Sequence, residues 1–118
     1  MKRIDSNARL SKAVIANGFV FMSGFTAADK EQDVSGQTND ILQQIDKYLQ
    51  EAGTDKRHLV SVNIWLKDIG DFAPMNEAWE NWVDPDATPA RATVQSSLAR
   101  PEILVEMMAQ AVLPGSGT

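Results

Sequence analysis

The chain has 118 residues with a formal net charge of −5, and its 43% hydrophobic and 23% charged content fits one globular domain spanning residues 1–118. The absence of cysteine excludes disulfides, thiolate metal sites and a cysteine nucleophile. The acidic charge argues against a nucleic-acid partner, and without a membrane-length apolar run or a secretory signal we expect a cytoplasmic protein with no membrane partner.

A β-hairpin is predicted near the start of the chain. Residues 13–16 form a short apolar run, the pair Asn17-Gly18 is a strong turn signal, and residues 19–23 are rich in strand-forming side chains. The polar stretch 27–36 is expected to be a surface loop. Four basic residues precede the hairpin, and we interpret them as a solvated edge: Lys2, Arg3, Arg9 and Lys12.

A helix and a strand are predicted in the middle of the chain. Apolar side chains recur at helical spacing over residues 37–52, and Gly53 follows where a C-terminal cap is expected. Apolar and polar residues alternate with period two over residues 58–66, which predicts a strand with at least one buried face.

A second helix and two more strands complete the predicted order. Asp71 is expected to be the N-cap of a helix that ends near Val83, and the last strands are predicted at about residues 91–97 and 104–113. This order favours an α+β fold, with two helices on one face of a mixed β-sheet. Because the strands are apolar on both sides in places, the uncovered face is expected to pack against another subunit.

Two charged residues stand out in the last two predicted strands, which are otherwise mostly apolar. They are Arg91 and Glu106, and an unpaired buried charge is costly enough to suggest a functional site. A guanidinium at Arg91 could bind a carboxylate, while the competing interpretation is a structural ion pair between the two residues. If the two strands pair as an antiparallel hairpin, the two side chains lie near the same end.

The segments around these residues closely resemble the signature of the RidA/YjgF family of enamine and imine deaminases. The matching segments are Pro89-Ala90-Arg91-Ala92-Thr93-Val94 and Leu104-Val105-Glu106-Met107. The resemblance covers nearly the whole chain, and segments 9–14 and 79–83 are most similar to the YoaB-like branch. Further segments match in the expected order: 13–18, 21–24, 62–65, Lys67-Asp68, 71–73 and Asn76.

The resemblance implies a chorismate-mutase-like fold assembled as a homotrimer, with clefts between the subunits. In such a cleft Arg91 would clamp the carboxylate of a 2-imino acid, and Glu106 would position or activate the attacking water. The hydroxyl of Ser23 and the backbone at Thr93 would be further contacts to this small-molecule imino or oxo acid.

This chemistry is expected to need no metal and no organic cofactor. A protonated imine is already electrophilic, so the protein must only orient a carboxylate, a water and a proton donor or acceptor. We expect the Arg91 guanidinium to favour the ionised form of Glu106. No His or Lys is evidently placed to activate Ser23, which is therefore interpreted as a hydrogen-bond partner.

Three functions are kept as hypotheses. The first is hydrolysis of reactive 2-imino or 2-enamino acids to 2-oxo acids and ammonia. The second is a non-catalytic trimeric module, either ligand-binding or regulatory, that senses 2-oxo acids in the same cleft without turnover. The third is the RNA-cleaving or translation-inhibiting role that some family members are said to have, against which the acidic charge and the solitary His58 argue.

Three positions depart from the best-studied branch of the family. Leu10 or Ser11 falls where that branch has a tyrosine, Met108 replaces the second acid of a Glu-x-Glu strand, and Phe25 replaces a polar residue. The resulting pocket is expected to be more apolar and to favour larger substrate side chains.

Overall fold

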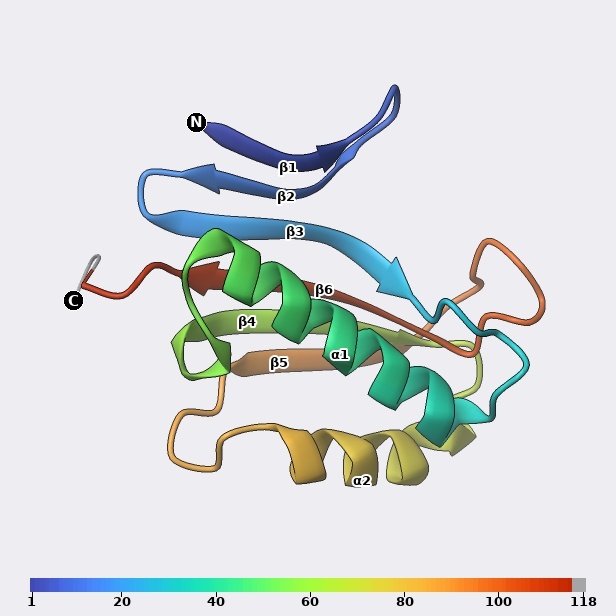
Figure 1. Ribbon diagram of the computed structural model, residues 1–118. Helices are drawn as coiled ribbons and strands as arrows, with labels where there is room; N and C mark the ends of the chain where they lie inside the picture. Colours follow the sequence, from blue (N-terminus) through green and yellow to red (C-terminus); the bar gives the residue numbers. More distant parts are fainter. Residues whose placement is uncertain (116–118) are drawn as a thin grey trace.

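Six strands form one mixed sheet, and two helices cover one of its faces, in a computed structural model that describes residues 1–115 (Figure 1). The predicted α+β arrangement is confirmed, and the predicted domain extends three residues beyond the described part. The elements are β1 (Lys2–Ser6), β2 (Ser11–Ala16), β3 (Phe19–Thr26), α1 (Val34–Ala52), β4 (Leu59–Leu66), α2 (Phe72–Trp82), β5 (Ala90–Gln95) and β6 (Val105–Val112), with short 3-10 turns at Lys56–His58 and Ile69–Asp71.

The predicted hairpin is confirmed as β2 and β3. Its turn places Asn17 and Gly18 in the left-handed region, with φ of 51° and 79°, which an Asn-Gly pair tolerates well. Strand β1, which was not predicted, pairs with β2 at the edge of the sheet. Its charged residues Lys2, Arg3 and Asp5 leave no apolar pattern, and they suit an edge strand because charge discourages pairing with other chains.

Helix α1 has the caps that its sequence predicts, although it begins three residues earlier than residue 37. The side chain of Asp33 accepts a hydrogen bond from the backbone N–H of Gly36 at 2.9 Å, which satisfies one free donor of the first turn. Gly53 ends the helix in the left-handed region with φ of 92°. One face of the helix packs on the sheet and buries Ile41, Leu42, Ile45 and Leu49.

Helix α2 also lies where it was predicted, but its start differs in detail. Asp71 occupies the N-cap position without making a side-chain capping bond. Asp68 instead accepts a hydrogen bond from the N–H of Gly70 in the preceding 3-10 turn, at 2.8 Å. The helix buries Met75 and Trp79, and it lies beside β5 at the edge of the sheet (Figure 1).

The sheet order is β1-β2-β3-β6-β4-β5, so β4 lies between the last two strands. Strand β4 pairs antiparallel with β6 and parallel with β5. The hairpin pairing considered for β5 and β6 is therefore wrong, because the loop over residues 96–104 carries the chain past the end of β4. Because β4 lies between β5 and β6, its registers with these two strands determine which face of the sheet carries the side chains of Arg91 and Glu106.

The sheet has one covered face and one open face. The covered face carries the buried core of the strands, including Val20, Ile64 and Met107. On the open face large apolar side chains remain exposed, among them Met108 and the pair Phe19 and Phe21, whose ring centroids are 5.9 Å apart. The uncovered apolar face inferred from the sequence is thus present, and its packing against another subunit stays a prediction.

A fully buried glutamine, Gln37, links the start of α1 to the loop over residues 96–104. Its Nε2 lies within hydrogen-bond distance of the carbonyl oxygens of Lys30, Gln32 and Glu102, at 3.3, 3.1 and 3.0 Å. Its Oε1 accepts from the backbone N–H of Leu104 at 3.0 Å. One side chain therefore satisfies backbone groups from two loops that are distant in sequence.

Replacing Gln37 with alanine is expected to lower the free energy of unfolding by about 2–4 kcal/mol, because buried backbone groups lose their partners. Urea denaturation followed by circular dichroism measures the change. Gln43→Ala is the matched control, since Gln43 is exposed on the same helix and should change stability by less than about 0.5 kcal/mol. Equal effects of the two substitutions would contradict the role given to Gln37.

Candidate functional site

The Arg91 side chain lies on the covered face of the sheet, held against α2. Arg91 pairs with Val62 in the parallel β4–β5 ladder and so shares the face of that buried valine. Its Nη1 donates to Oδ1 of Asn76 at 2.7 Å, and its guanidinium carbon lies 5.3 Å and 5.8 Å from the ring centroids of Trp79 and Phe72. These contacts orient the guanidinium without neutralising it.

The charge of Arg91 has no ion-pair partner among residues 1–115. Burial lowers the pKa of its guanidinium, which Glu80 partly offsets, but a guanidinium remains protonated at any physiological pH. The competing interpretation of a structural pair with Glu106 is therefore wrong within the described protomer. A half-buried cation with free donors is a ready site for a carboxylate.

The Glu106 side chain lies on the open face, at the centre of the sheet. It pairs across the ladders with Thr26 of β3 and Trp65 of β4. A β-carbon added at Gly24 would collide with the Glu106 carboxylate, so a larger residue at position 24 would displace this carboxylate from its present position. Burial raises the pKa of Glu106 above its ordinary value.

A cavity of about 210 Å³ adjoins Glu106. Trp65, which was not among the predicted site residues, forms part of its wall. The signal for it was the alternation of β4, in which Trp65 has the opposite parity to Val62 and Ile64. The lining residues are Trp65, Ser96, Ser97, Leu98, Ala99 and Glu106.

Arg91 and Glu106 face opposite sides of the sheet in one protomer. Their partners in β4 are Val62 and Trp65, which are three residues apart and therefore point to opposite faces. The expectation that Arg91 favours the ionised form of Glu106 is wrong within the protomer, where burial alone shifts the pKa of Glu106 upward. A site that uses both side chains needs a second subunit.

Two buried hydroxyl groups, those of Ser23 and Thr93, have no hydrogen-bond partner among residues 1–115. Ser23 lies in the irregular part of β3 between Phe21 and Gly24, and Thr93 lies two residues beyond Arg91 on the same face. A buried hydroxyl left without a partner costs about 1–3 kcal/mol, so both groups are suited to bind a ligand or another subunit. The sequence assigned only the backbone of Thr93, not its hydroxyl.

The three departures from the family pattern lie in different places. Phe25 is buried in the core against Tyr48, with ring centroids 5.3 Å apart, so the prediction that it makes the pocket more apolar is wrong. Met108 lies on the open face two residues from Glu106 and is partly exposed. Leu10 is exposed in the turn between β1 and β2.

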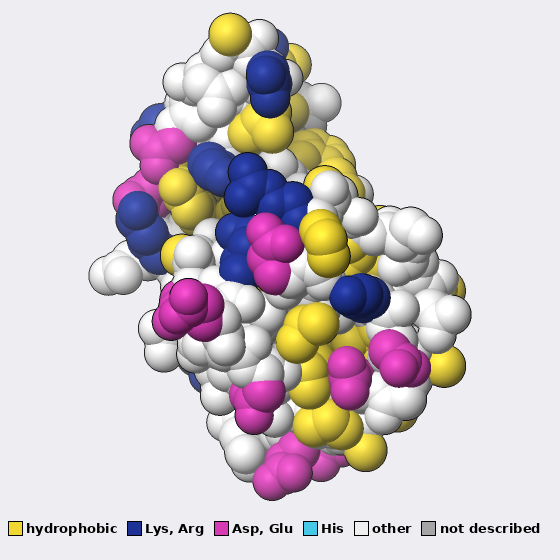
Figure 2. Space-filling model, turned by 90° about the vertical axis from the view of Figure 1, so that its right-hand side faces the viewer, with side chains coloured by type: hydrophobic (Ala, Val, Ile, Leu, Met, Phe, Trp, Pro, Cys, Tyr) yellow, Lys and Arg dark blue, Asp and Glu magenta, His cyan; other side chains and the backbone are white. Residues whose placement is uncertain are grey.

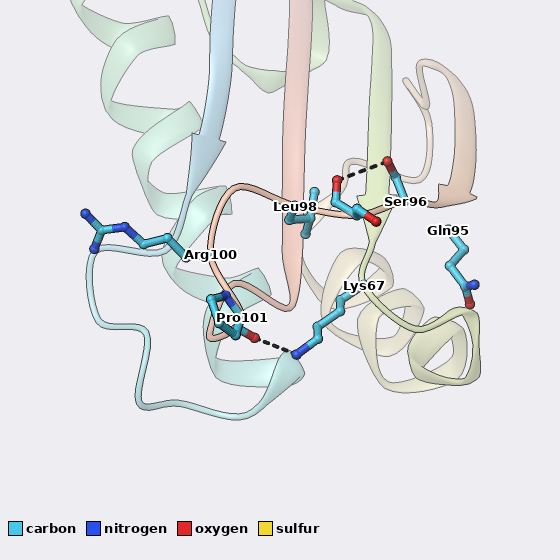
Figure 3. Close-up of a pocket in the computed structure, with 7 residues that line it drawn as sticks. Lys67, Gln95, Ser96, Leu98, Arg100 and Pro101 are labelled. Carbon is cyan, nitrogen blue, oxygen red and sulfur yellow. Dashed lines mark hydrogen bonds between the residues drawn. The ribbon is translucent and has the colours of Figure 1, made fainter.

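A larger cavity, of about 560 Å³, lies beside the Glu106 cavity at the carboxyl ends of β4 and β5 (Figure 3). Its Lys67 is oriented by a hydrogen bond from Nζ to the carbonyl oxygen of Pro101, at 2.6 Å. The lining residues are Lys67, Gln95, Ser96, Ser97, Leu98, Arg100 and Pro101.

The family model described as Endoribonuclease L-PSP matches residues 1–113. A RutC family protein of Haemophilus ducreyi is 36% identical over 111 residues, covering 94% of this chain and 95% of the relative. The RutC family protein YoaB of Escherichia coli is 39% identical over 105 residues, covering 89% and 91%. This chain belongs to the RidA/YjgF family. The sequence resemblance, including its YoaB-like character, is thereby confirmed.

The solved structures of the RidA/YjgF family agree with the fold described above. A crystal structure of a YjgF family member from Neisseria meningitidis superposes with a TM-score of 0.93 at 43% sequence identity, covering 98% of this chain and 96% of that one. A YjgF/YER057c/UK114 family member from Mycobacterium tuberculosis superposes at 0.83 with 27% identity, covering 92% and 91%. The predicted chorismate-mutase-like fold is confirmed. No helix within residues 1–115 is long and apolar enough to cross a membrane.

Proposed function

We propose that this chain hydrolyses reactive 2-imino or 2-enamino acids to 2-oxo acids and ammonia, in clefts between the subunits of a homotrimer. The observation that carries the proposal is the Arg91 guanidinium, half-buried, oriented by Asn76 and unpaired with any carboxylate in residues 1–115. Glu106 of a neighbouring subunit completes the site, because Glu106 lies on the open face of the sheet, which no helix covers and which is therefore available for a subunit interface. Family membership supports the same chemistry.

The protein's part in the reaction is to hold and polarise the reactants. Arg91 binds the substrate carboxylate through two N–H donors, which fixes the position of the imine carbon. Glu106 accepts a proton from a water as the water oxygen bonds to that carbon, and the C=N electrons move to nitrogen. Glu106 then returns the proton to the nitrogen, which gives a carbinolamine with a protonated amino group. The C–N bond breaks as the hydroxyl oxygen forms the carbonyl, the hydroxyl proton passes to Glu106, and a 2-oxo acid and ammonia are released.

The unpaired hydroxyls of Ser23 and Thr93 supply further hydrogen bonds in this arrangement. Each can donate to a carboxylate or carbonyl oxygen of the substrate, or accept from the amino group. Both hydroxyl groups are assigned to substrate binding and not to nucleophilic attack, because no base in the described part of the chain, residues 1–115, lies within hydrogen-bond distance of either.

The rate should fall in acid, because water activation needs the carboxylate form of Glu106, whose pKa burial raises above its ordinary value in the protomer. Measuring kcat/KM against pH, corrected for uncatalysed hydrolysis, tests this expectation. Glu106→Gln should remove the dependence together with most of the activity. A fall in acid that survives in Glu106→Gln would assign the titration to another group.

A direct test uses imines generated in the assay by an amino-acid oxidase. Ammonia release and trapping of the remaining imine with semicarbazide are followed with and without the protein. The non-catalytic alternative predicts binding of pyruvate or 2-oxobutanoate by calorimetry without accelerated ammonia release from any imine. A crystal soaked with a 2-oxo acid should place the carboxylate against Arg91, and a ligand elsewhere would reject the site.

A role in RNA cleavage has less support from the residues of this chain, although the family description names an endoribonuclease. The single His58 is bonded to Asp55 at 3.1 Å in a 3-10 turn, away from Arg91 and Glu106 in sequence and sheet position. The net charge of −5 is unfavourable for phosphate binding. Absent or salt-insensitive RNA binding is the expected result of a filter-binding assay.

A further inference from the structure

The cavity beside Glu106 extends into the larger cavity at the ends of β4 and β5. The two share three lining residues, Ser96, Ser97 and Leu98. Their volumes of about 210 Å³ and 560 Å³ place most of the free space on the side away from Glu106. A substrate whose reacting carbon lies at Glu106 can therefore direct its side chain into the larger cavity.

The position of Lys67 relative to Glu106 follows from the sheet. Trp65 pairs with Glu106, and the β4–β6 ladder continues by one further bond, from the backbone N–H of Lys67 to the carbonyl of Leu104 at 3.0 Å. Lys67 is two residues beyond Trp65, so its side chain points to the same open face. Two residues of extended strand span about 7 Å, so the backbone of Lys67 lies about this far along the strand direction from Trp65 and its partner Glu106.

The charged side chains that line the larger cavity are both cations. Lys67 donates one of its three N–H groups to Pro101 and has two left for a ligand. The neighbouring acids do not engage it: Asp68 accepts from the N–H of Gly70, and Glu102 lies 3.8 Å from Arg100. No carboxylate within residues 1–115 forms an ion pair with Lys67.

Arg100 is less suited than Lys67 to contact a ligand in the larger cavity. Figure 3 shows its guanidinium directed away from Lys67 and Ser96, and its side chain is 68% exposed. Lys and Arg side chains also gather near the middle of the molecular face that includes this loop, around a few acidic ones (Figure 2). The two cations of the cavity wall, Lys67 and Arg100, favour the approach of an anionic substrate in spite of the negative net charge.

We infer that Lys67 binds a second carboxylate of the substrate, so that this chain prefers short 2-imino dicarboxylic acids. The inference rests on the proposed function and names its substrate class. With the first carboxylate at Arg91 and the imine carbon at Glu106, one or two methylene groups carry the second carboxylate toward Lys67. The expectation of larger substrate side chains rested on three departures from the family pattern, and one of these, Phe25, lies in the core and not in the pocket.

The test compares imines generated from aspartate or glutamate with the imine generated from leucine, using oxidases matched to each amino acid. The wild-type protein should have a higher kcat/KM for the imines generated from aspartate or glutamate than for the imine generated from leucine. Lys67→Gln should lower that value by about 10-fold to 100-fold, as expected for the loss of a hydrogen bond to a charged group, and change the leucine value less than about twofold. Lys47→Gln removes the same charge from an exposed position on α1 and should change neither.

The outcomes separate this inference from the proposed function. A wild-type preference for the leucine imine, or an equal effect of Lys67→Gln on both classes, overturns the role of Lys67 and leaves imine hydrolysis standing. If no imine is hydrolysed, the proposed function fails. Calorimetry with a 2-oxo dicarboxylate then tests separately whether Lys67 binds a carboxylate. Binding that Lys67→Gln weakens at least about 10-fold supports the carboxylate site, and binding that it leaves unchanged overturns it.

Discussion

Replacing Arg91 with glutamine is expected to lower kcat/KM for imine hydrolysis by about 10²-fold or more while the protein stays folded. The guanidinium is the carboxylate clamp of the proposed site, and glutamine offers no charge and no paired N–H donors in its place. The free energy of unfolding should fall by no more than about 1–3 kcal/mol, because Arg91 forms no ion pair within residues 1–115 and the substitution removes only the hydrogen bond to Asn76 and the contacts with two aromatic rings. Steady-state kinetics and thermal unfolding of the same preparations measure both quantities.

Two further arginine variants make this result specific. Arg91→Lys keeps the charge but loses the planar fork, so most of the activity should still be lost. Arg57→Gln removes a charge from an exposed arginine whose partner is Asp55, and its kinetics should match those of the wild type. Full activity of Arg91→Gln would reject the carboxylate clamp, and an equal loss in Arg57→Gln would point to net charge instead.

The local features of the fold could be read from the sequence. The Asn17-Gly18 turn and the Gly53 cap depend on backbone conformations that few other residues adopt, so their positions fix element ends. Strand β1 was missed because its side chains are mostly exposed and give no apolar alternation. The order of β4, β5 and β6 was missed because alternation identifies a strand without identifying its neighbours.

The candidate site was predictable in its residues but not in its geometry. Arg91 and Glu106 were visible as charges within apolar strands, whereas their opposite faces follow only from their registers with β4. Phe25 was misplaced for a related reason. Simple alternation from Val20 and Met22 turns Phe25 away from the core, but the irregular register between Phe21 and Gly24 shifts the alternation and turns it inward.

The opposite orientation of Arg91 and Glu106 also leads to a complementation experiment. Glu106→Gln alone should lower the rate by about 10²-fold, because the water loses its base. If each site takes Arg91 from one subunit and Glu106 from the next, a trimer that mixes Arg91→Gln and Glu106→Gln chains contains some wild-type sites. A mixed trimer has two chains of one kind and one of the other, so one of its three sites combines an intact Arg91 with an intact Glu106, and the activity of the mixed assemblies should return to about a third of the wild-type rate.

The mixture is prepared by co-expression with two different affinity tags, so that only mixed assemblies are assayed, and each variant purified alone sets the background. Subunit composition and size are measured by light scattering on the same samples. If Arg91 and Glu106 acted within one chain, every site in the mixture would carry a substitution and the rate would stay at the background. Restored activity therefore requires a site shared between subunits, which one protomer cannot form because its sheet lies between the two side chains.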